Sequence, residues 1–181
     1  MHIRNGFQAI TITLLALLPS TCISQSYQGP SGGRGGKPFD HWATSNGAKD
    51  IAGVSFLQDS TIRCIYVLYR DLPAASSQLK NGYCDPPPGP LSFNGSKGIS
   101  LDPDEYIIGI AGRFGDHIDS IRIYTNKKNS PVFGGNGGTD DFGYTAPHGQ
   151  MIVGFLGRAG DNLDAIGVLY APCTPVKTGC T

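Results

Sequence analysis

The sequence repeats one strand-turn-strand unit three times, and this repetition limits the possible folds more than any other feature. The copies are residues 53–69 (GVSFLQDSTIRCIYVLY), 109–125 (GIAGRFGDHIDSIRIYT) and 154–170 (GFLGRAGDNLDAIGVLY), which align without a gap. Alternation after the turn predicts one apolar face per unit. Because no hairpin of this size can bury a core alone, we expect an all-β fold whose three units share one core around a pseudo-threefold axis. The matched apolar residues are Ile62, Ile118 and Leu163, then Ile65, Ile121 and Ile166, then Val67, Ile123 and Val168.

A second, glycine-rich repeat lies between these units. Residues 32–39 read GGRGGKPF and residues 134–142 read GGNGGTDDF, while a degraded third copy falls at residues 89–93. The chain has 26 glycines and 13 prolines, placed between short apolar segments as turns are in an all-β domain. No segment shows a sustained helical period, and residues 71–90 are predicted to form a loose excursion tied back by Cys84.

The first residues have the features of an export signal. Arg4 supplies the positive charge, residues 9–18 form an apolar run too short to span a bilayer, and residues 22–24 fit a small-residue cleavage site. We therefore expect a signal peptide at residues 1–24 and a mature N-terminus at Gln25. No other stretch is long enough for a membrane span, so the mature protein is expected to be soluble, secreted and extracellular.

Removal of the signal leaves four cysteines, an even number that suggests two disulfides in an exported chain. Three pairings are possible. Short loops favour Cys64 with Cys84 and Cys173 with Cys180. A zinc site fits poorly, since the spacings are wrong and no histidine lies near them in sequence. The 14 basic and 14 acidic residues balance, which leaves no basic field for a nucleic-acid partner.

Several motifs occur in an order that resembles the jacalin-related lectins. They are GGRGGKPFD at residues 32–40, TNKK at 125–128 followed by FGGNGG, and GRAGDNLDAIGV at 157–168. The resemblance covers about residues 29–171. It implies a β-prism of three four-stranded Greek-key sheets, with a lectin domain at residues 25–172 and a disulfide-linked tail at 173–181. It also implies a carbohydrate site without metal or cofactor, and no enzymatic activity.

The resemblance places the primary carbohydrate site where the last hairpin turn meets the N-terminal glycine loop. An ionised carboxylate can accept two hydrogen bonds from vicinal sugar hydroxyls, and successive turn amides can donate back. Asp164 is the expected bidentate acceptor in an exposed turn, and a glycine lets the loop backbone approach the ring. The expected carbohydrate-binding residues are Gly36, Gly160, Asp161, Asn162 and Asp164.

The middle copy keeps both aspartates at the same spacing and predicts a second carbohydrate site. Its expected residues are Gly138, Asp116, His117 and Asp119. The same spacing also suits a simple hairpin turn, so the two interpretations stay open here. The first copy has Arg63 in place of the key aspartate and a degraded glycine loop, so no site is expected there.

The expected ligands are mannose- or glucose-type glycans on glycoproteins or cell surfaces. In the family that the chain resembles, galactose preference requires a free N-terminus at the position of Gly36, and signal cleavage leaves residues ahead of it. A single site should bind a monosaccharide at roughly millimolar concentration. Useful affinity then needs multivalency, from two sites on one chain or from a homo-oligomer.

Two other classes of function compete with a mannose-type lectin. A glycosidase needs carboxylates that flank a bond, whereas Asp161 and Asp164 share one turn and one side of the ring. The alternative that stays open is a secreted scaffold or packaging protein that binds anionic, glycosaminoglycan-like glycans. Its basic residues around the same loops would be Arg34, Lys37, Arg113 and Arg158.

Overall fold

The computed structural model describes residues 26–47, 50–70, 72, 78–82, 97–173 and 180. Three sequence-based expectations lie outside the described residues: the signal peptide at residues 1–24, the bonding partner Cys84, and the degraded glycine copy at residues 89–93.

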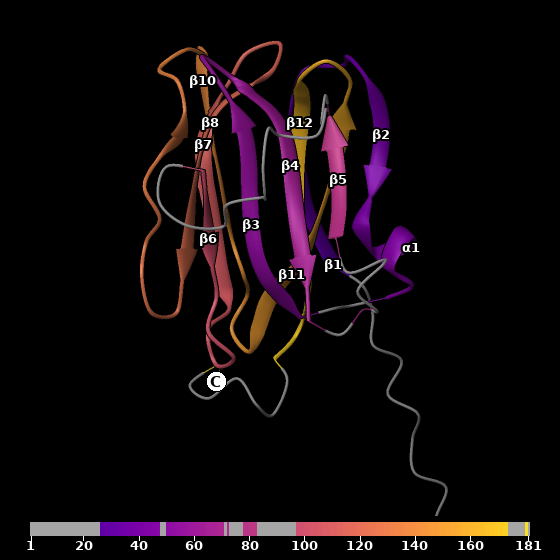
Figure 1. Cartoon of the computed structure of the whole chain (residues 1–181), viewed down its shortest axis with the longest axis vertical. Helices are drawn as coiled ribbons and strands as arrows, with labels where there is room; N and C mark the ends of the chain where they lie inside the picture. The colour runs from indigo at the N-terminus through magenta and orange to yellow at the C-terminus, as the bar shows by residue number, and fades with distance from the viewer. Residues whose placement is uncertain are drawn as a thin grey trace, which may run out of the picture.

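Twelve strands form three antiparallel groups of four, each built around one copy of the repeated hairpin (Figure 1). The first group has the order β5(Gln78–Gly82), β4(Ile62–Tyr69), β3(Ile51–Gln58), β6(Gly98–Ser100). The second has the order β10(Asp140–Thr145), β7(Ile107–Phe114), β8(Ile118–Thr125), β9(Phe133–Gly134). The third has the order β1(Ser26–Gly32), β12(Leu163–Pro172), β11(Gln150–Ala159), β2(Lys37–Asp40).

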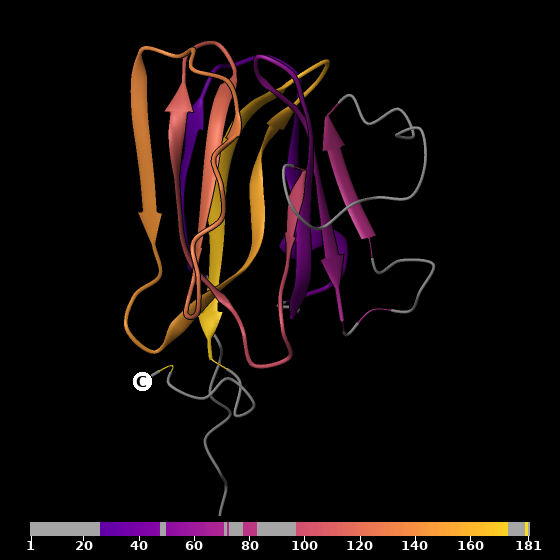
Figure 2. The same ribbon diagram turned by 60° about the vertical axis from the view of Figure 1, so that its left-hand side comes forward.

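The second and third groups join through a single pair, Ile107 with Ile152, so that they form one continuous eight-stranded sheet. The strands run along the length of the molecule in both views (Figures 1 and 2). This arrangement confirms the predicted all-β prism of three Greek-key sheets with pseudo-threefold symmetry.

The matched apolar residues of the three hairpins form the centre of one shared core. None of the nine is more than 1% exposed, and all belong to a single cluster of buried side chains. Burying a branched aliphatic side chain contributes about 1.5–3 kcal/mol, so each hairpin is stabilised mainly by the other two. The core also explains why the sequence period was a reliable guide: the same face is buried in every copy.

Two elements differ from what the sequence indicated. The excursion at residues 71–90 includes strand β5, which pairs with β4 from Cys64–Gly82 to Leu68–Gln78, and no apolar alternation announces it. A one-turn helix, α1(His41–Ser45), follows the first glycine loop. The Asp40 carboxylate starts the helix by accepting hydrogen bonds from the backbone N–H groups of Trp42 and Ala43, at 2.8 and 3.3 Å.

The structure confirms one of the two expected disulfides. Cys173 and Cys180 form a disulfide with their Cα atoms 6.0 Å apart. Cys64 is fully buried and is also disulfide-bonded, and its expected partner Cys84 is outside the described residues. In the described part of the chain, no helix is both long enough and apolar enough to cross a membrane.

His41 is buried in neutral form between the third and first groups of strands. Its Nδ1 atom accepts from the Phe155 backbone N–H at 3.4 Å and lies 3.2 Å from the Tyr69 hydroxyl. Nε2 therefore carries the proton and donates to Asn81 Oδ1 at 2.6 Å. Burial lowers the pKa of His41 to about 4, against the smaller opposing effects of Asn81 and Asp40.

This histidine should make stability depend on pH. In the unfolded chain a histidine titrates near 6.5, so between that pH and the folded pKa the unfolded state binds more protons. The stabilisation present above about pH 6.5 is lost as the pH falls towards the folded value. From about pH 7 to about pH 5, we expect the free energy of unfolding to drop by about 2 kcal/mol from His41 alone.

Urea denaturation of the intact chain and of His41→Gln across this range measures that contribution. The pH slope should become flatter in His41→Gln, whereas His148→Gln, which changes an exposed histidine, should keep it. Equal slopes in all three proteins would show that folding leaves the pKa of His41 unchanged and would contradict this expectation.

Candidate functional site

The three hairpin turns meet at one end of the prism, which is the upper end in Figure 1. Thr61 of the first turn donates from Oγ1 to Asn162 Oδ1 of the third turn at 3.3 Å. His117 of the second turn reaches Asp164 of the third, with Nδ1 3.1 Å from Oδ1. The turns that the repeat placed at matched positions are thus direct neighbours in space.

The N-terminal glycine loop lies against the third turn so closely that only glycine fits. Gly36 has φ +56°, and a Cβ there would press on the Ala159 backbone and on Asp164 Oδ2. A Cβ on Gly160 would lie 3.2 Å from the Gly36 Cα atom. The loop is also tied to the turn by the Gly33 N–H, which donates to the Asp164 carbonyl at 2.8 Å. The sequence-predicted partners Gly36 and Asp164 are therefore in contact.

An arginine that the sequence analysis had assigned only to anionic-glycan binding holds this loop in place. The Arg158 guanidinium donates from Nε to the Gly35 carbonyl and from Nη2 to the Gly36 carbonyl, both at 2.7 Å. The repeat carried the signal: an arginine stands at the matched position Arg113 of the second copy, and Leu57 stands there in the first. This pairing fixes the distance between the glycine backbone and the turn.

Asp164 is buried, which corrects the expectation of an exposed turn carboxylate. The residue is 5% exposed, and its Oδ1 is the oxygen that faces His117. Its Oδ2 is buried against Gly36 and has no hydrogen-bond partner among the described residues. An unpaired buried carboxylate oxygen is costly, typically by about 1–3 kcal/mol or more, unless a ligand or water donates to it. Asp164 Oδ2 is therefore a hydrogen-bond acceptor to which a ligand hydroxyl or amine can donate.

The other predicted residues of this turn surround the carboxylate at the surface. Gly160 and Asp161 are exposed and Asn162 is half-buried. The turn closes through the Gly160 N–H, which donates to the Asn162 carbonyl at 2.9 Å.

The second turn repeats the same construction with the second glycine loop. Gly138 has φ +78°, and a Cβ on it would lie 2.9 Å from Asp119 Oδ2. Arg113 donates to the Gly138 carbonyl at 2.7 Å and to the Asn136 carbonyl at 3.3 Å, as Arg158 does in the other loop. Asp119 is half-buried and Asp116 is exposed. Gly138 and Asp119 thus lie together as the repeat predicted, and Asp116 lies at the surface of the same turn.

His117 does not join this second group, although the sequence placed it there. Its ring turns to the neighbouring turn, where it pairs with Asp164. The residue before it, Asp116, has its carbonyl packed against Gly33 of the first glycine loop. The second turn therefore supports the primary group of residues from the side, and the repeat could not show this, because the contact runs between copies.

The first turn is closed by its own ion pair. Arg63 Nη1 lies 3.3 Å from Asp59 Oδ2, and the Thr61 backbone N–H donates to Asp59 Oδ1 at 3.1 Å. The Thr61 hydrogen bond, aided by Arg63, holds the pKa of Asp59 below its usual range. The turn has neither an aspartate at the position of Asp164 nor an arginine at that of Arg158.

Among the described residues, no cluster of three or more histidine, cysteine, aspartate or glutamate side chains could hold a metal ion. The third turn with the glycine loop at residues 32–36, and the second turn with the glycine loop at residues 134–138, are called the two turn-and-loop groups below. Each group places a carboxylate, which accepts hydrogen bonds, beside backbone N–H groups, which donate them, so each can bind hydroxyl groups directly.

The chain matches the family model of the jacalin-like lectin domain over residues 28–169. A variant of Malaysian banana lectin is similar in structure, with 25% identity, a TM-score of 0.65, and coverage of 82% of this chain and 99% of that one. Calystegia sepium agglutinin has 27% identity and a TM-score of 0.62, covering 82% and 97%. Artocarpin, solved as a mannotriose complex, has 28% identity and a TM-score of 0.63, covering 81% and 97%. No curated protein sequence is significantly similar to the chain.

The contact between His117 and Asp164 should stabilise the fold. His117→Ala removes the one hydrogen-bond donor that the described residues give the buried carboxylate. Leaving such a group unpaired costs about 1–3 kcal/mol, and the partial exposure of the ring favours the lower end. Chemical denaturation should show this loss for His117→Ala but not for the matched control His148→Ala. Equal stability of the two variants would mean that water replaces the imidazole at no cost.

Proposed function

The chain belongs to the family of jacalin-like lectin domains, and from this premise we propose that it is a secreted, metal-independent lectin for mannose- or glucose-type glycans. Members of this family and fold are carbohydrate binders without enzymatic activity. The specificity, the export and the independence of metal are the parts proposed here.

The observation that carries the proposal is the buried, unpaired Oδ2 atom of Asp164 beside Gly36. A sugar hydroxyl that donates to this oxygen forms a charge-assisted hydrogen bond, the stronger kind. A neighbouring hydroxyl of the same ring can use the second carboxylate oxygen or the backbone of the turn at Asp161 and Asn162. The Arg158 pairing keeps the Gly36 backbone in place before the ligand arrives, so less ordering is needed on binding.

Two further observations support the choice of sugar. Gly36 lies within a continuous chain, because β1 precedes it and pairs with β12. Gly36 therefore has a peptide N–H in place of the free amine that galactose-type members have at this position, which favours a mannose- or glucose-type sugar. The similar artocarpin structure contains mannotriose, which favours a mannose-type ligand here.

Direct hydrogen bonds from the two turn-and-loop groups supply the proposed binding, so no metal is required. EDTA should leave sugar affinity unchanged, and a loss of binding on chelation would contradict this part of the proposal.

The alternative of binding anionic glycans through the same loops is less favoured. Arg113 and Arg158 use their guanidinium groups to hold the glycine loops through carbonyl oxygens. Only Arg34 and Lys37, both exposed, remain of the four cations proposed for that role. Two separated surface cations give a weak electrostatic attraction at physiological salt.

Export is supported by the sequence signal and agrees with the Cys173–Cys180 disulfide, since such bonds persist in oxidising compartments. Two proposed sites on one end of one chain allow a branched glycan or a crowded surface to engage both. Such multivalency raises the overall affinity without any new contact, and assembly into a homo-oligomer would add to it.

Calorimetric titration with methyl α-mannoside tests the two-site proposal. We use Asp→Asn changes because Asp164 is buried and asparagine keeps its shape. Each change removes a charge-assisted acceptor, which costs about 1.5–3 kcal/mol, or roughly ten- to hundredfold in affinity. The intact chain should bind two sugars, Asp164→Asn and Asp119→Asn one each, and the double variant none. Arg63→Ala should change nothing. A stoichiometry of one that Asp119→Asn leaves unaltered would restrict binding to the third turn.

The placement of His117 gives a sharper test. In an Asp119→Asn background only the primary site remains, and His117→Ala should weaken it by roughly three- to tenfold, because the Asp164 carboxylate loses the partner that orients it. In an Asp164→Asn background, His117→Ala should leave the second site unaltered. Weaker binding of His117→Ala in the Asp164→Asn background only would mean that His117 belongs to the second site, as the repeat alone predicted.

A further inference from the structure

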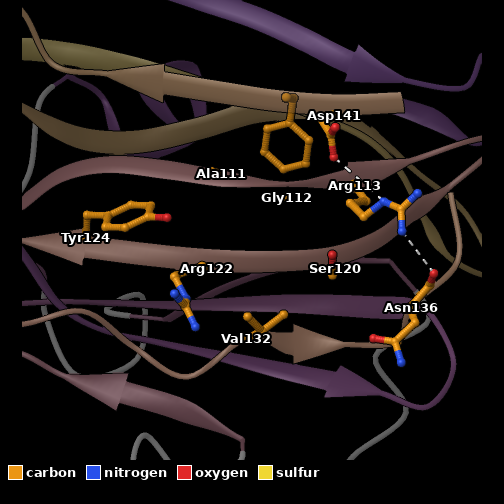
Figure 3. Close-up of a pocket in the computed structure, with 11 residues that line it drawn as sticks. Ala111, Gly112, Arg113, Ser120, Arg122, Tyr124, Val132, Asn136 and Asp141 are labelled. Atoms are coloured by element: carbon orange, nitrogen blue, oxygen red, sulfur yellow. Dashed lines mark hydrogen bonds and ion pairs between the residues drawn. The ribbon is translucent and has the colours of Figure 1, made fainter. Parts of the chain in front are cut away.

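A groove of about 480 Å³ lies on the outer face of the second group of strands, the face opposite the shared core (Figure 3). Strands β7, β8 and β10 and the segment before the second glycine loop line it. Figure 3 shows Arg122 and Val132 on one side, Tyr124 at one end, and Arg113 with Asp141 and Asn136 towards the other. The groove thus begins beside the loop that forms the proposed second sugar site.

Small residues make the floor of this groove. Ala111 lies between Arg122 of β8 and Gly143 of β10 in the sheet register, and a Cβ on Gly143 would meet no atom within 4 Å. At the position that matches Ala111, the third hairpin has the larger Leu156. Leu156 packs against a second, smaller cluster of buried side chains, which includes Met151 and Leu169. The third group of strands also has a groove of about 480 Å³, lined by Leu156 and Arg158 among others, but the position matched to Arg122 is Gly167 there and supplies no cation.

Arg122 is the unusual side chain of the groove. It is half-buried, and its Nε atom is buried without a hydrogen-bond partner among the described residues. The described part of the chain gives it no ion pair either. Arg113, by contrast, donates to the Gly138 carbonyl and pairs with Asp141 at 3.6 Å.

The fold itself does not require an arginine at this position. The matched residues of the other two hairpins are Tyr66 and Gly167, and both hairpins form the same strands. A guanidinium with a buried, unsatisfied N–H costs free energy unless something accepts from it. Its planar donors suit a carboxylate or a sulfate, which can accept two parallel hydrogen bonds.

We propose that this groove binds the anionic group of an acidic saccharide, a carboxylate or a sulfate ester, on Arg122. The proposal rests on the sugar-binding function given above, and it adds an acidic residue linked to the sugar at the second site. Asn136 belongs to the glycine loop at residues 134–138 and Arg113 donates to carbonyls of that loop, and both line the groove, so a ligand can extend from the loop into the groove. Val132, which is 51% exposed, and the Tyr124 ring offer apolar contact to the face of a second ring.

The test compares three synthetic disaccharides that share a mannose and differ in the second residue: glucose, glucuronic acid or glucose 6-sulfate. All are titrated into the Asp164→Asn chain, in which only the second site remains. We expect at least one acidic disaccharide to bind about tenfold more tightly than the neutral one at low salt, with the advantage shrinking as salt rises. The uronate and sulfate arms identify which anion the groove accepts.

Arg122→Gln should remove this advantage and leave the affinity for the neutral disaccharide as before, while Arg63→Gln, outside the groove, keeps the advantage. Thermal melting verifies that each variant is folded. In the ¹⁵N spectrum, the Arg122 Nε–Hε signal, assigned by its loss in Arg122→Gln, should shift with the acidic ligand only. Equal affinities for all three disaccharides, or an acidic preference that survives Arg122→Gln, would overturn the proposal. Failure of the neutral disaccharide to bind the Asp164→Asn chain would instead count against the second sugar site, and binding of the same disaccharide by the intact chain would show that the primary site is retained.

Discussion

The burial of one apolar face from each of three hairpins is the constraint on which the rest of the molecule depends. Each hairpin offers a few branched side chains, too few for a core of its own, and the nine matched residues become solvent-free only when all three faces meet. Closing the faces around an axis brings the three turns together at one end. The functional surface is therefore a geometric consequence of the core, and it needs no dedicated element.

Within this frame the turns are free to diverge, because the core holds their positions. The second and third turns keep an aspartate beside a glycine loop and an arginine that bonds to the loop carbonyls. The first turn has lost the aspartate and the arginine and uses Arg63 to neutralise Asp59 instead. The outer sheet faces diverge in the same way, with Arg122 in the second hairpin where the third has Gly167. Function in this fold is set by substitutions at matched positions.

The sequence predicted the features that recur within each repeat unit, but it did not predict the contacts between different units. Hairpin bounds, core residues and the pairing of Gly36 with Asp164 all followed from matched spacing and family resemblance. The contact from His117 to Asp164 joins different copies, so no period could show it. The burial of Asp164 was also missed, since exposure depends on how tightly the glycine loop packs. Strand β5 lacked any apolar alternation, and its place depends on contacts with distant segments: the pairing with β4 and the hydrogen bond between Asn81 and His41.

A crystal structure of the chain with bound mannobiose would show whether the two turn-and-loop groups are the sugar sites. We expect one sugar ring with hydroxyls on Asp164 Oδ2 and the Gly36 loop, a second on Asp119 and the Gly138 loop, and none at Arg63. Sugar bound elsewhere on the prism, with Asp164 Oδ2 still unpaired or bonded only to water, would contradict this expectation.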